Sequence, residues 1–150
     1  MLTARLLREG NAVATGPIDL LGRLEAAINA HDLEALVACF DSQVDSRQPA
    51  HPARDFTGNA QVRQNWTQIF GGVPDLSARL IRHVAQDDTV WAEWAWSGTS
   101  RNGQPFEMRG VTILSTGDNR FKRVTFYMEA MDSSGSDVGA SVRQLAGKPE

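Results

Sequence analysis

Apolar residues in the first half of the chain recur at the three- and four-residue spacing of helices. Residues 18–28 and 33–40 carry two such stripes, and Asp32 stands where it can cap the second helix. A third stripe predicts a helix that begins with Asn59 as its N-cap and ends at Gly71 and Gly72. The apolar positions of the three stripes are Ile18, Leu21, Leu24, Ala27 and Ile28, then Leu33, Leu36, Val37 and Phe40, then Val62, Trp66, Ile69 and Phe70.

The second half of the chain has the composition of β-strands. Four runs rich in Val, Ile, Thr and aromatic residues are separated by QDD, SRNGQ and GDN, which are suitable hairpin turns. A short strand between the helices, residues 43–46, ends before Pro49. The fold class predicted is α+β: a curved, mostly antiparallel sheet wraps around three N-terminal helices and leaves a cone-shaped hollow. The four runs are residues 76–85, 89–99, 106–116 and 121–131.

The two ends of the chain differ from the body. Residues 1–17 are expected to form an N-terminal extension, with a short helix at residues 2–8 that Gly and Pro separate from the first helix of the body. Residues 132–150 are rich in Ser, Gly and Asp and predict a flexible tail, or one that lies on a partner subunit. The expected domain is therefore residues 18–131.

Composition narrows the class of protein. Hydrophobic residues make up 41% and charged residues 22% of the chain, as in an ordinary globular domain. A net charge of −3 offers no basic surface for phosphates, so nucleic acid is not an expected partner. No apolar run approaches the ~20 residues of a membrane span. The lone Cys39 excludes an internal disulfide, and with no signal peptide visible we expect a cytoplasmic protein.

An aromatic cluster is the first candidate for a binding site. Trp94 and Trp96 are two residues apart on one predicted strand, so they share a face, while Trp91 has the opposite parity and is expected to face outward. Such a cluster either packs the core or lines a pocket for a flat hydrophobic molecule. The candidate ligand-binding residues are Trp66, Trp94, Trp96, Met108, Thr112, Phe126 and Met128.

Polar residues after the first strand are the candidates for chemistry. His51 can serve as a general acid or base near neutral pH, and Asp55 is placed to orient it. Gln48 can donate to a ligand carbonyl, and Arg47 can hold a carboxylate, but alternation allows only one of these two to face inward. The structural alternatives are a solvated loop histidine and a polar strand end.

A second polar set lies on the predicted sheet. Glu93, Glu107 and Arg109 share a face and form either an ion-pair ladder on the outside or, on the concave face, a site that activates water. The histidines at positions 31, 51 and 83 have no metal-ligand spacing, so no metal site is expected. No cofactor motif is visible either.

The order of elements resembles the nuclear transport factor 2-like superfamily, in its SnoaL-like and ketosteroid-isomerase-like branch. The resemblance spans about residues 18–131, and the stretches that carry it are INAHDLEALVACF, RQP, FTGNAQVRQNW, EWAWSGTSRNGQPFEMRGVTI and GDNRFKRVTFYME. It implies a cystatin-like α+β roll around a pocket for a small hydrophobic molecule, and frequent pairing into homodimers. Enzymes and simple binders share this fold.

The residues that carry out the known reactions of this superfamily are absent at the matching positions of this chain. Ketosteroid isomerases place an aspartate before the proline where this chain has Gln48, and the places of their oxyanion donors hold Leu24 and Thr112. Limonene epoxide hydrolases use an Asp-Arg-Asp set whose places here hold Trp94, Trp96 and Phe126. Neither activity is expected, and the polyketide cyclase branch stays open.

The predicted function is a cofactor-free pocket protein acting on a hydrophobic metabolite by acid/base chemistry, as an isomerase, cyclase or hydrolase. His51 is then the acid or base, Gln48 or Arg47 the carbonyl donor, and the tryptophans the walls. The alternative is a non-catalytic ligand-binding or dimerisation module of the same fold.

Overall fold

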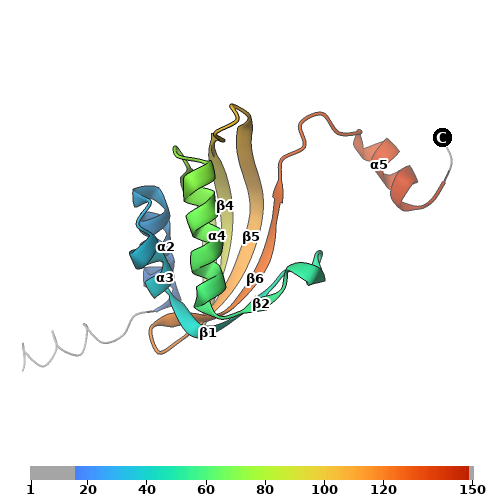
Figure 1. The fold of residues 1–150 in the computed structure, drawn as a ribbon. Coiled ribbons are helices and arrows are strands. Elements are labelled where there is room, and N and C mark those ends of the chain that lie inside the picture. The colour runs from blue at the N-terminus through green and yellow to red at the C-terminus, as the bar shows by residue number, and fades with distance from the viewer. Residues whose placement is uncertain (1–15, 149–150) are drawn as a thin grey trace, which may run out of the picture.

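The structure, a computed structural model, describes residues 16–148. Three helices precede most of the sheet and a fourth follows it, as Figure 1 shows. The helices are α2 (Pro17–Ala30), α3 (Leu33–Ala38), α4 (Asn59–Gly72) and α5 (Val138–Leu145), with one 3-10 turn η1 (Pro52–Arg54). The strands are β1 (Phe40–Arg47), β2 (Phe56–Thr57), β3 (Ser77–Gln86), β4 (Thr89–Thr99), β5 (Pro105–Gly117) and β6 (Arg120–Ala130).

The first two helices form where the apolar stripes predict them. In α2 the stripe is buried, and the helix ends at His31, whose backbone is left-handed with a φ of 52°. Asp32 then caps α3, because its carboxylate accepts a hydrogen bond from the backbone N–H of Ala35 at 3.0 Å. The predicted role of Asp32 is confirmed. The buried stripe of α2 consists of Leu20, Leu21, Leu24, Ala27 and Ile28.

Helix α4 differs from the prediction at both of its ends. Asn59 is the first helical residue and not the cap, since Gly58 occupies the cap position with a φ of 101°. A residue with a side chain is strained at that angle, which favours glycine. At the other end the helix includes Gly72, and Val73 is its C-cap.

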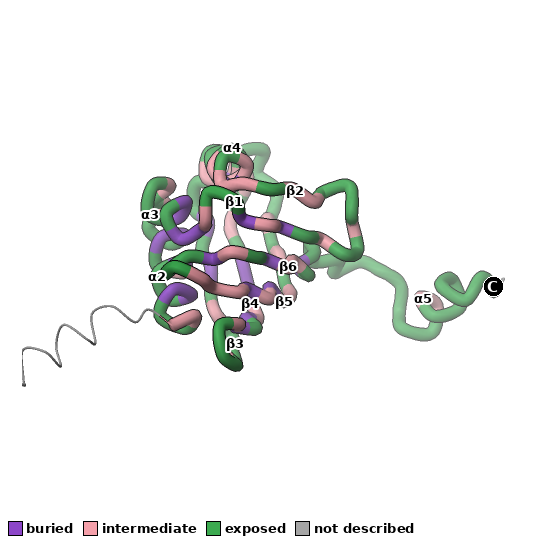
Figure 2. The backbone as a smooth tube through the Cα atoms, turned by 90° about the horizontal axis from the view of Figure 1, so that it is seen from below, coloured by how far each residue is buried: buried purple, intermediate pink, exposed green. Residues whose placement is uncertain are grey.

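The six strands form one sheet in the order β2-β1-β6-β5-β4-β3. All neighbouring pairs are antiparallel except β1 and β6, which run parallel. Figure 2 shows the sheet curling, with α2, α3 and α4 on its concave side. The predicted α+β class, with a curved, mostly antiparallel sheet on three helices, is confirmed.

Alternation along the central strands separates two faces of the sheet. Trp94, Trp96, Leu114 and Met128 are buried on the concave face. Trp91, on the same strand as the first two, is 53% exposed on the convex face. The concave face packs against the helices and makes the hydrophobic core, so the same strands supply both core and surface.

Tight turns hold the hairpins together. Asp118 and Asn119 connect β5 to β6 with positive φ values of 53° and 59°, the geometry of a two-residue turn matched to the twist of the strands. In the middle of β5, Gly110 has a φ of 147°, and a Cβ there would lie 2.7 Å from the Cα of Met128. The close approach of β5 and β6 at this point requires glycine.

The two ends of the chain meet the predictions differently. Residues 138–145 form α5, capped by Asp137, where a flexible tail was predicted; α5 lies apart from the sheet in Figure 1. The predicted N-terminal extension lies outside the described residues up to position 15, as does the short helix expected at residues 2–8. None of the helices in the described part of the chain is long and apolar enough to span a bilayer.

Candidate functional site

A cavity of about 560 Å³ lies between the concave face of the sheet and the helices. This volume suits a small organic ligand. Its inner part is lined by buried apolar residues from α2, β1, β5 and β6, and solvent-exposed lining residues mark its mouth. The inner residues are Leu24, Ile28, Phe40, Val44, Leu114 and Val124, and the exposed ones are Arg54, Gln68, Glu129 and Ala130.

All of the residues predicted to bind a ligand stand on the wall of this cavity. They come from α4, β4, β5 and β6, and alternation on the three strands turns them inward as expected. They are Trp66, Trp94, Trp96, Met108, Thr112, Phe126 and Met128. The cluster thus lines a cavity and also packs the core, so both interpretations of it apply. Ligand binding by these residues stays a prediction.

The aromatic rings form one continuous wall around Trp96. The ring centroid of Trp96 lies 5.3 Å from that of Trp66, and 6.2 Å from those of both Trp94 and Phe126. The rings are tilted or edge-on to one another, which is the favourable arrangement for aromatic pairs. A flat hydrophobic ligand would meet ring faces and edges here.

Polar groups interrupt this wall at only a few points. The Nε1–H of Trp94 donates a hydrogen bond to the hydroxyl of Thr112 at 2.9 Å, and both side chains are buried. Ser46, 8% exposed, also lines the cavity from β1. These hydroxyls can still donate to a ligand.

His51 and Glu129 make the closest polar contact at the mouth. The Nε2 of His51 lies 2.6 Å from a carboxylate oxygen of Glu129. Because a carboxylate only accepts, Nε2 is the nitrogen that donates the hydrogen of this contact. Glu129 is one of the lining residues of the cavity, and His51 is not. Glu129 pairs across the sheet with Arg109, so it has the outward parity of that residue, and its 59%-exposed carboxylate lies at the rim of the cavity and not on its inner wall.

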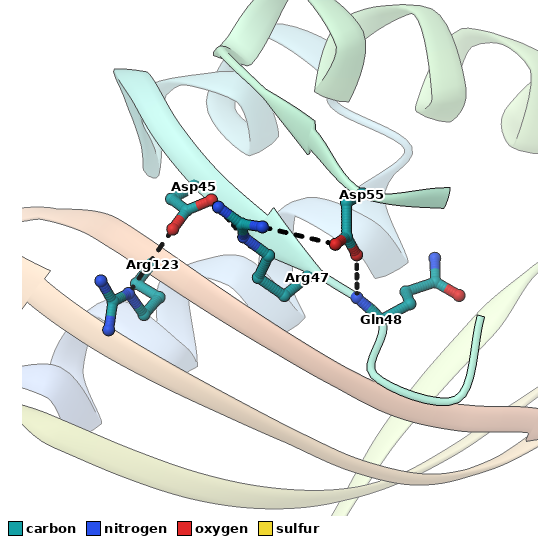
Figure 3. A network of polar contacts seen from close by, with 5 residues as sticks. All are labelled: Asp45, Arg47, Gln48, Asp55 and Arg123. Atoms are coloured by element: carbon teal, nitrogen blue, oxygen red, sulfur yellow. Dashed lines mark hydrogen bonds and ion pairs between the residues drawn. The ribbon is translucent and has the colours of Figure 1, made fainter. Parts of the chain in front are cut away.

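The expected contact between Asp55 and His51 is replaced by a different network, shown in Figure 3. Asp55 accepts hydrogen bonds from the backbone N–H of Gln48 at 2.7 Å and from Arg47 at 3.5 Å. Arg47 also donates to Asp45 at 2.8 Å. The carboxylates, Asp45 first and then Asp55, raise the pKa of Arg47 above its ordinary value. Asp55 thus ties the loop that carries His51 to the end of β1.

Of the neighbours Arg47 and Gln48, only the second lines the cavity. The side chain of Arg47 is 57% exposed and engaged with carboxylates. Figure 3 shows the amide of Gln48 pointing away from that charged network. Gln48 is thus available as a ligand donor, and Arg47 is placed to hold the loop.

Five polar lining residues were not among the predicted site residues: Ser46, Arg54, Asn65, Gln68 and Glu129. Asn65 lies on α4 three residues after Val62 and next to Trp66, so it is on the helix face that carries these two residues. This spacing indicates that its side chain points towards the cavity. Ser46 shares the inward parity of Val44 on β1. Glu129 had no comparable local signal, because its partner His51 is 78 residues away in sequence.

The second polar set lies on the convex face. Glu93 forms an ion pair with Arg82 of β3 at 2.7 Å. Since Trp94 and Thr112 point inward, Glu93, Glu107 and Arg109 point outward. The structure therefore favours the outer ion pair over a water-activating site. In the described range 16–148, no three His, Cys, Asp or Glu residues are grouped as a metal site requires.

The fold places the protein in a structural class. Helices packed inside a curled sheet around a mostly apolar cavity are characteristic of the nuclear transport factor 2-like, cystatin-type α+β fold. Within that class the chain belongs to the SnoaL-like domain family, whose model matches residues 21–124. This confirms the resemblance seen in the sequence. No curated protein sequence matches the chain.

Several solved structures share the fold. Wild-type IdmH from Streptomyces antibioticus, a proposed polyketide cyclase, is 20% identical with a TM-score of 0.65, covering 88% of this chain and 99% of IdmH. A proposed isomerase from Bacillus subtilis is 18% identical with a TM-score of 0.66, covering 88% and 93% of the two chains. A protein with a ketosteroid isomerase-like fold from Catenulispora acidiphila is 18% identical with a TM-score of 0.63, covering 90% of this chain and 96% of that protein. These identities establish the fold alone.

Proposed function

We propose that this protein binds a small hydrophobic molecule in its cone and transforms it by proton transfer without a cofactor. The observation that carries this proposal is the His51–Glu129 pair, with 2.6 Å between its polar atoms, at the mouth of a 560 Å³ cavity. An apolar container needs no titratable pair at its entrance. Membership of a family with isomerase-like and cyclase-like structures also supports it.

The chemistry divides between the two side chains of the pair. The Glu129 carboxylate takes a proton from a carbon or hydroxyl of the ligand, and the electron pair of the broken bond stays on the ligand. The same carboxyl then returns the proton to another ligand atom, which completes an isomerisation or closes a ring. His51 orients the carboxylate through its Nε2–H.

Gln48 and the network behind it complete the proposed site. The Gln48 amide lines the cavity and can donate to a ligand oxygen. Asp55 fixes the backbone of Gln48, and Arg47 fixes Asp55. Arg47 and Asp55 are therefore positioning residues, whereas Glu129 and Gln48 would touch the ligand.

The test is a turnover screen by mass spectrometry on steroid enones, terpene epoxides and polyketide-like ketones. Glu129→Gln keeps the shape of the side chain and removes the base, so we expect it to lower kcat/KM by about 10²- to 10⁴-fold. His51→Ala should lower kcat more than it raises KM, because it misorients the base. Arg82→Gln, on the convex face, is the matched control and should keep full activity.

The competing function is a binding module of the same fold. It predicts ligand binding with no turnover, and an affinity that neither Glu129→Gln nor His51→Ala changes. Turnover that survives both substitutions would instead place the chemistry elsewhere on the chain. Either result would contradict the proposed acid/base pair.

We also propose that the protein forms a homodimer through the convex face of the sheet. Trp91 is 53% and Val84 66% exposed there, and they line a depression of about 220 Å³ together with Arg82, Glu93 and two neighbours. Exposed apolar groups rimmed by charges of both signs are typical of protein interfaces. The expected partner is a second copy, because the patch carries both an arginine and a glutamate.

Sedimentation equilibrium tests the homodimer. Trp91→Arg should convert the dimer to a monomer, while Ser97→Arg, exposed on the same face of β4, should leave it intact. A wild-type protein that is monomeric across the whole concentration range would contradict the proposal.

A further inference from the structure

The indole nitrogen of Trp96 is a buried donor with no partner. Trp96 is 6% exposed on the wall of the cavity, and no group within residues 16–148 accepts a hydrogen bond from its Nε1–H. Two residues earlier on the same strand, Trp94 donates to Thr112 at 2.9 Å. Buried tryptophans normally find such a partner, so the contrast between the two calls for an acceptor at Trp96.

The neighbours of Trp96 supply no oxygen for this nitrogen. Its ring is surrounded by those of Trp66, Trp94 and Phe126 at centroid distances of 5.3 to 6.2 Å. An aromatic face is only a weak acceptor for an N–H. The nitrogen is also closed off from solvent, so bulk water does not replace the missing acceptor. Trp96 lines the cavity, so a ligand there can supply the missing acceptor once the packing of the rings around the nitrogen opens.

The other buried polar groups of the cone point to the same chemistry. Thr112 uses an oxygen lone pair for Trp94, which leaves its O–H free to donate. The hydroxyl of Ser46 lines the cavity as well. Among residues 16–148, every buried polar side chain on the wall can therefore donate, and none is an acceptor alone. The one carboxylate that these residues contribute to the lining, Glu129, is at the mouth.

We infer that Trp96 is a specificity-determining residue whose Nε1–H binds an acceptor oxygen of the ligand, so that the cone selects hydrophobic carbonyl compounds over hydrocarbons. Because the nitrogen is enclosed, the inference requires the ring packing to shift, and the half-buried Trp66 of α4, with its ring centroid 5.3 Å from that of Trp96, is the neighbour that would give way. This inference rests on the proposed function, because it requires that the cavity take a ligand.

The position of Trp96 along the sheet adds a consequence. Trp96 pairs with Met108, and Met108 pairs with Ala130, so these three residues form one row across β4, β5 and β6. Ala130 follows Glu129 directly. A carbonyl oxygen held by Trp96 therefore lies on the row of the sheet next to Glu129, whose carboxylate is at the rim of the cavity.

Fluorenone and fluorene test the inference, because the two tricyclic molecules differ only in a carbonyl and a methylene. Fluorene is the more hydrophobic, so a cone that recognises shape and apolar area alone binds fluorene more tightly. A hydrogen bond from Trp96 Nε1–H to the carbonyl oxygen of fluorenone reverses this order of affinities. We expect wild-type protein to bind fluorenone about tenfold more tightly than fluorene. The full-length chain is used throughout.

Variants then separate Trp96 from the rest of the wall. Trp96→Phe removes the N–H and part of the aromatic wall, so both probes can lose contact area, but fluorenone binding should weaken about tenfold more than fluorene binding because only fluorenone loses the hydrogen bond. Trp91→Phe, on the convex face of the same strand, is the matched control and should change neither affinity. Circular dichroism confirms that both variants are folded.

A spectroscopic readout needs no destabilising substitution. The chain has four tryptophans, so its ¹H–¹⁵N spectrum contains four indole signals, and that of Trp96 is assigned by its loss in Trp96→Phe or by through-space contacts to Phe126. Fluorenone should shift this indole proton downfield, and fluorene should not.

The outcomes separate the inference from the proposed function. Equal affinities for the two probes, or an unmoved Trp96 indole signal in the fluorenone complex, overturn the role of Trp96 and leave the pocket function standing. If neither probe perturbs any cavity resonance, the proposed hydrophobic pocket is contradicted, and the inference fails with it.

Discussion

The concave and convex faces of the sheet are built from alternate residues of the same strands, yet they differ in every property that matters for function. On β4, Trp94 and Trp96 are buried against helices and a cavity, whereas Trp91 stands 53% exposed. On the concave face polar groups are few and buried; on the convex face Arg82 and Glu93 pair in solvent. Residue type is thus a poor guide to role here, and parity along the strand is a good one.

The largest difference is expected in stability when one tryptophan is removed from each face. Trp94→Ala deletes a buried ring and leaves Thr112 without its partner, which should lower the free energy of unfolding by about 3–5 kcal/mol. Trp91→Ala should change the monomer's free energy of unfolding by no more than about 0.5 kcal/mol. Urea denaturation of both variants measures the contrast, and equal losses would refute the division of the faces.

The next effect concerns the bend that makes one face concave. Gly110→Ala should destabilise the protein by about 1–3 kcal/mol or more, because a Cβ at a φ of 147° is strained and meets the backbone of β6. Gly22→Ala is the control: nothing lies within 4 Å of a Cβ there, and alanine favours the helix. Thermal unfolding followed by circular dichroism should show a lower Tm for the first variant only.

A smaller effect is expected from the buried hydrogen bond of the concave wall. Thr112→Val keeps the shape and removes the acceptor of Trp94 Nε1–H, so the free energy of unfolding should fall by about 1–3 kcal/mol. Thr125→Val, a half-exposed position on β6, is the comparison and should cost less. If both cost the same, the Trp94–Thr112 bond contributes nothing measurable.

The smallest effect is expected from charges outside the core. Hydrogen bonds from the backbone N–H of Gln43 and from Lys122 hold the pKa of Asp41 below its ordinary value of 3.8. A lowered pKa stabilises the fold above that value, and this contribution is lost as the pH falls through the pKa of the folded state. Asp41→Asn should therefore be less stable than wild type at pH 7, and the difference should shrink towards pH 3 in urea denaturation.

A difference between Asp41→Asn and wild type that stays constant from pH 7 to pH 3 would contradict this assignment. Lys122 is raised in pKa by the same contact, but it keeps its charge over this range and does not disturb the comparison.

Local pattern was enough to predict the helices, the meander and the direction of each tryptophan on β4. These features depend on spacing within a few residues, because a helix repeats every 3.6 residues and a strand every two. Where a choice depended on backbone detail, prediction was less exact: Gly58 and not Asn59 caps α4, and the helix at residues 138–145 was not predicted.

The candidate site was predicted in part for the same reason. The seven cavity-facing residues follow from parity, and only the structure shows that they enclose free volume. The orienting partner of His51 was expected at Asp55, four residues away, but the structure pairs His51 with Glu129 from the far end of the chain. Sequence neighbours are easy to propose as partners, whereas the packing of β1 beside β6 decides which side chains meet.

The amino-acid sequence by itself thus determined the α+β class, the elements and the face on which each strand residue lies, since these are set by the periodicity of apolar residues. Tertiary structure alone decided the parallel pairing of β1 with β6, the depth of the cone, the His51–Glu129 contact and the partnerless nitrogen of Trp96. Each of these depends on distances between residues far apart in the chain, which periodicity does not encode.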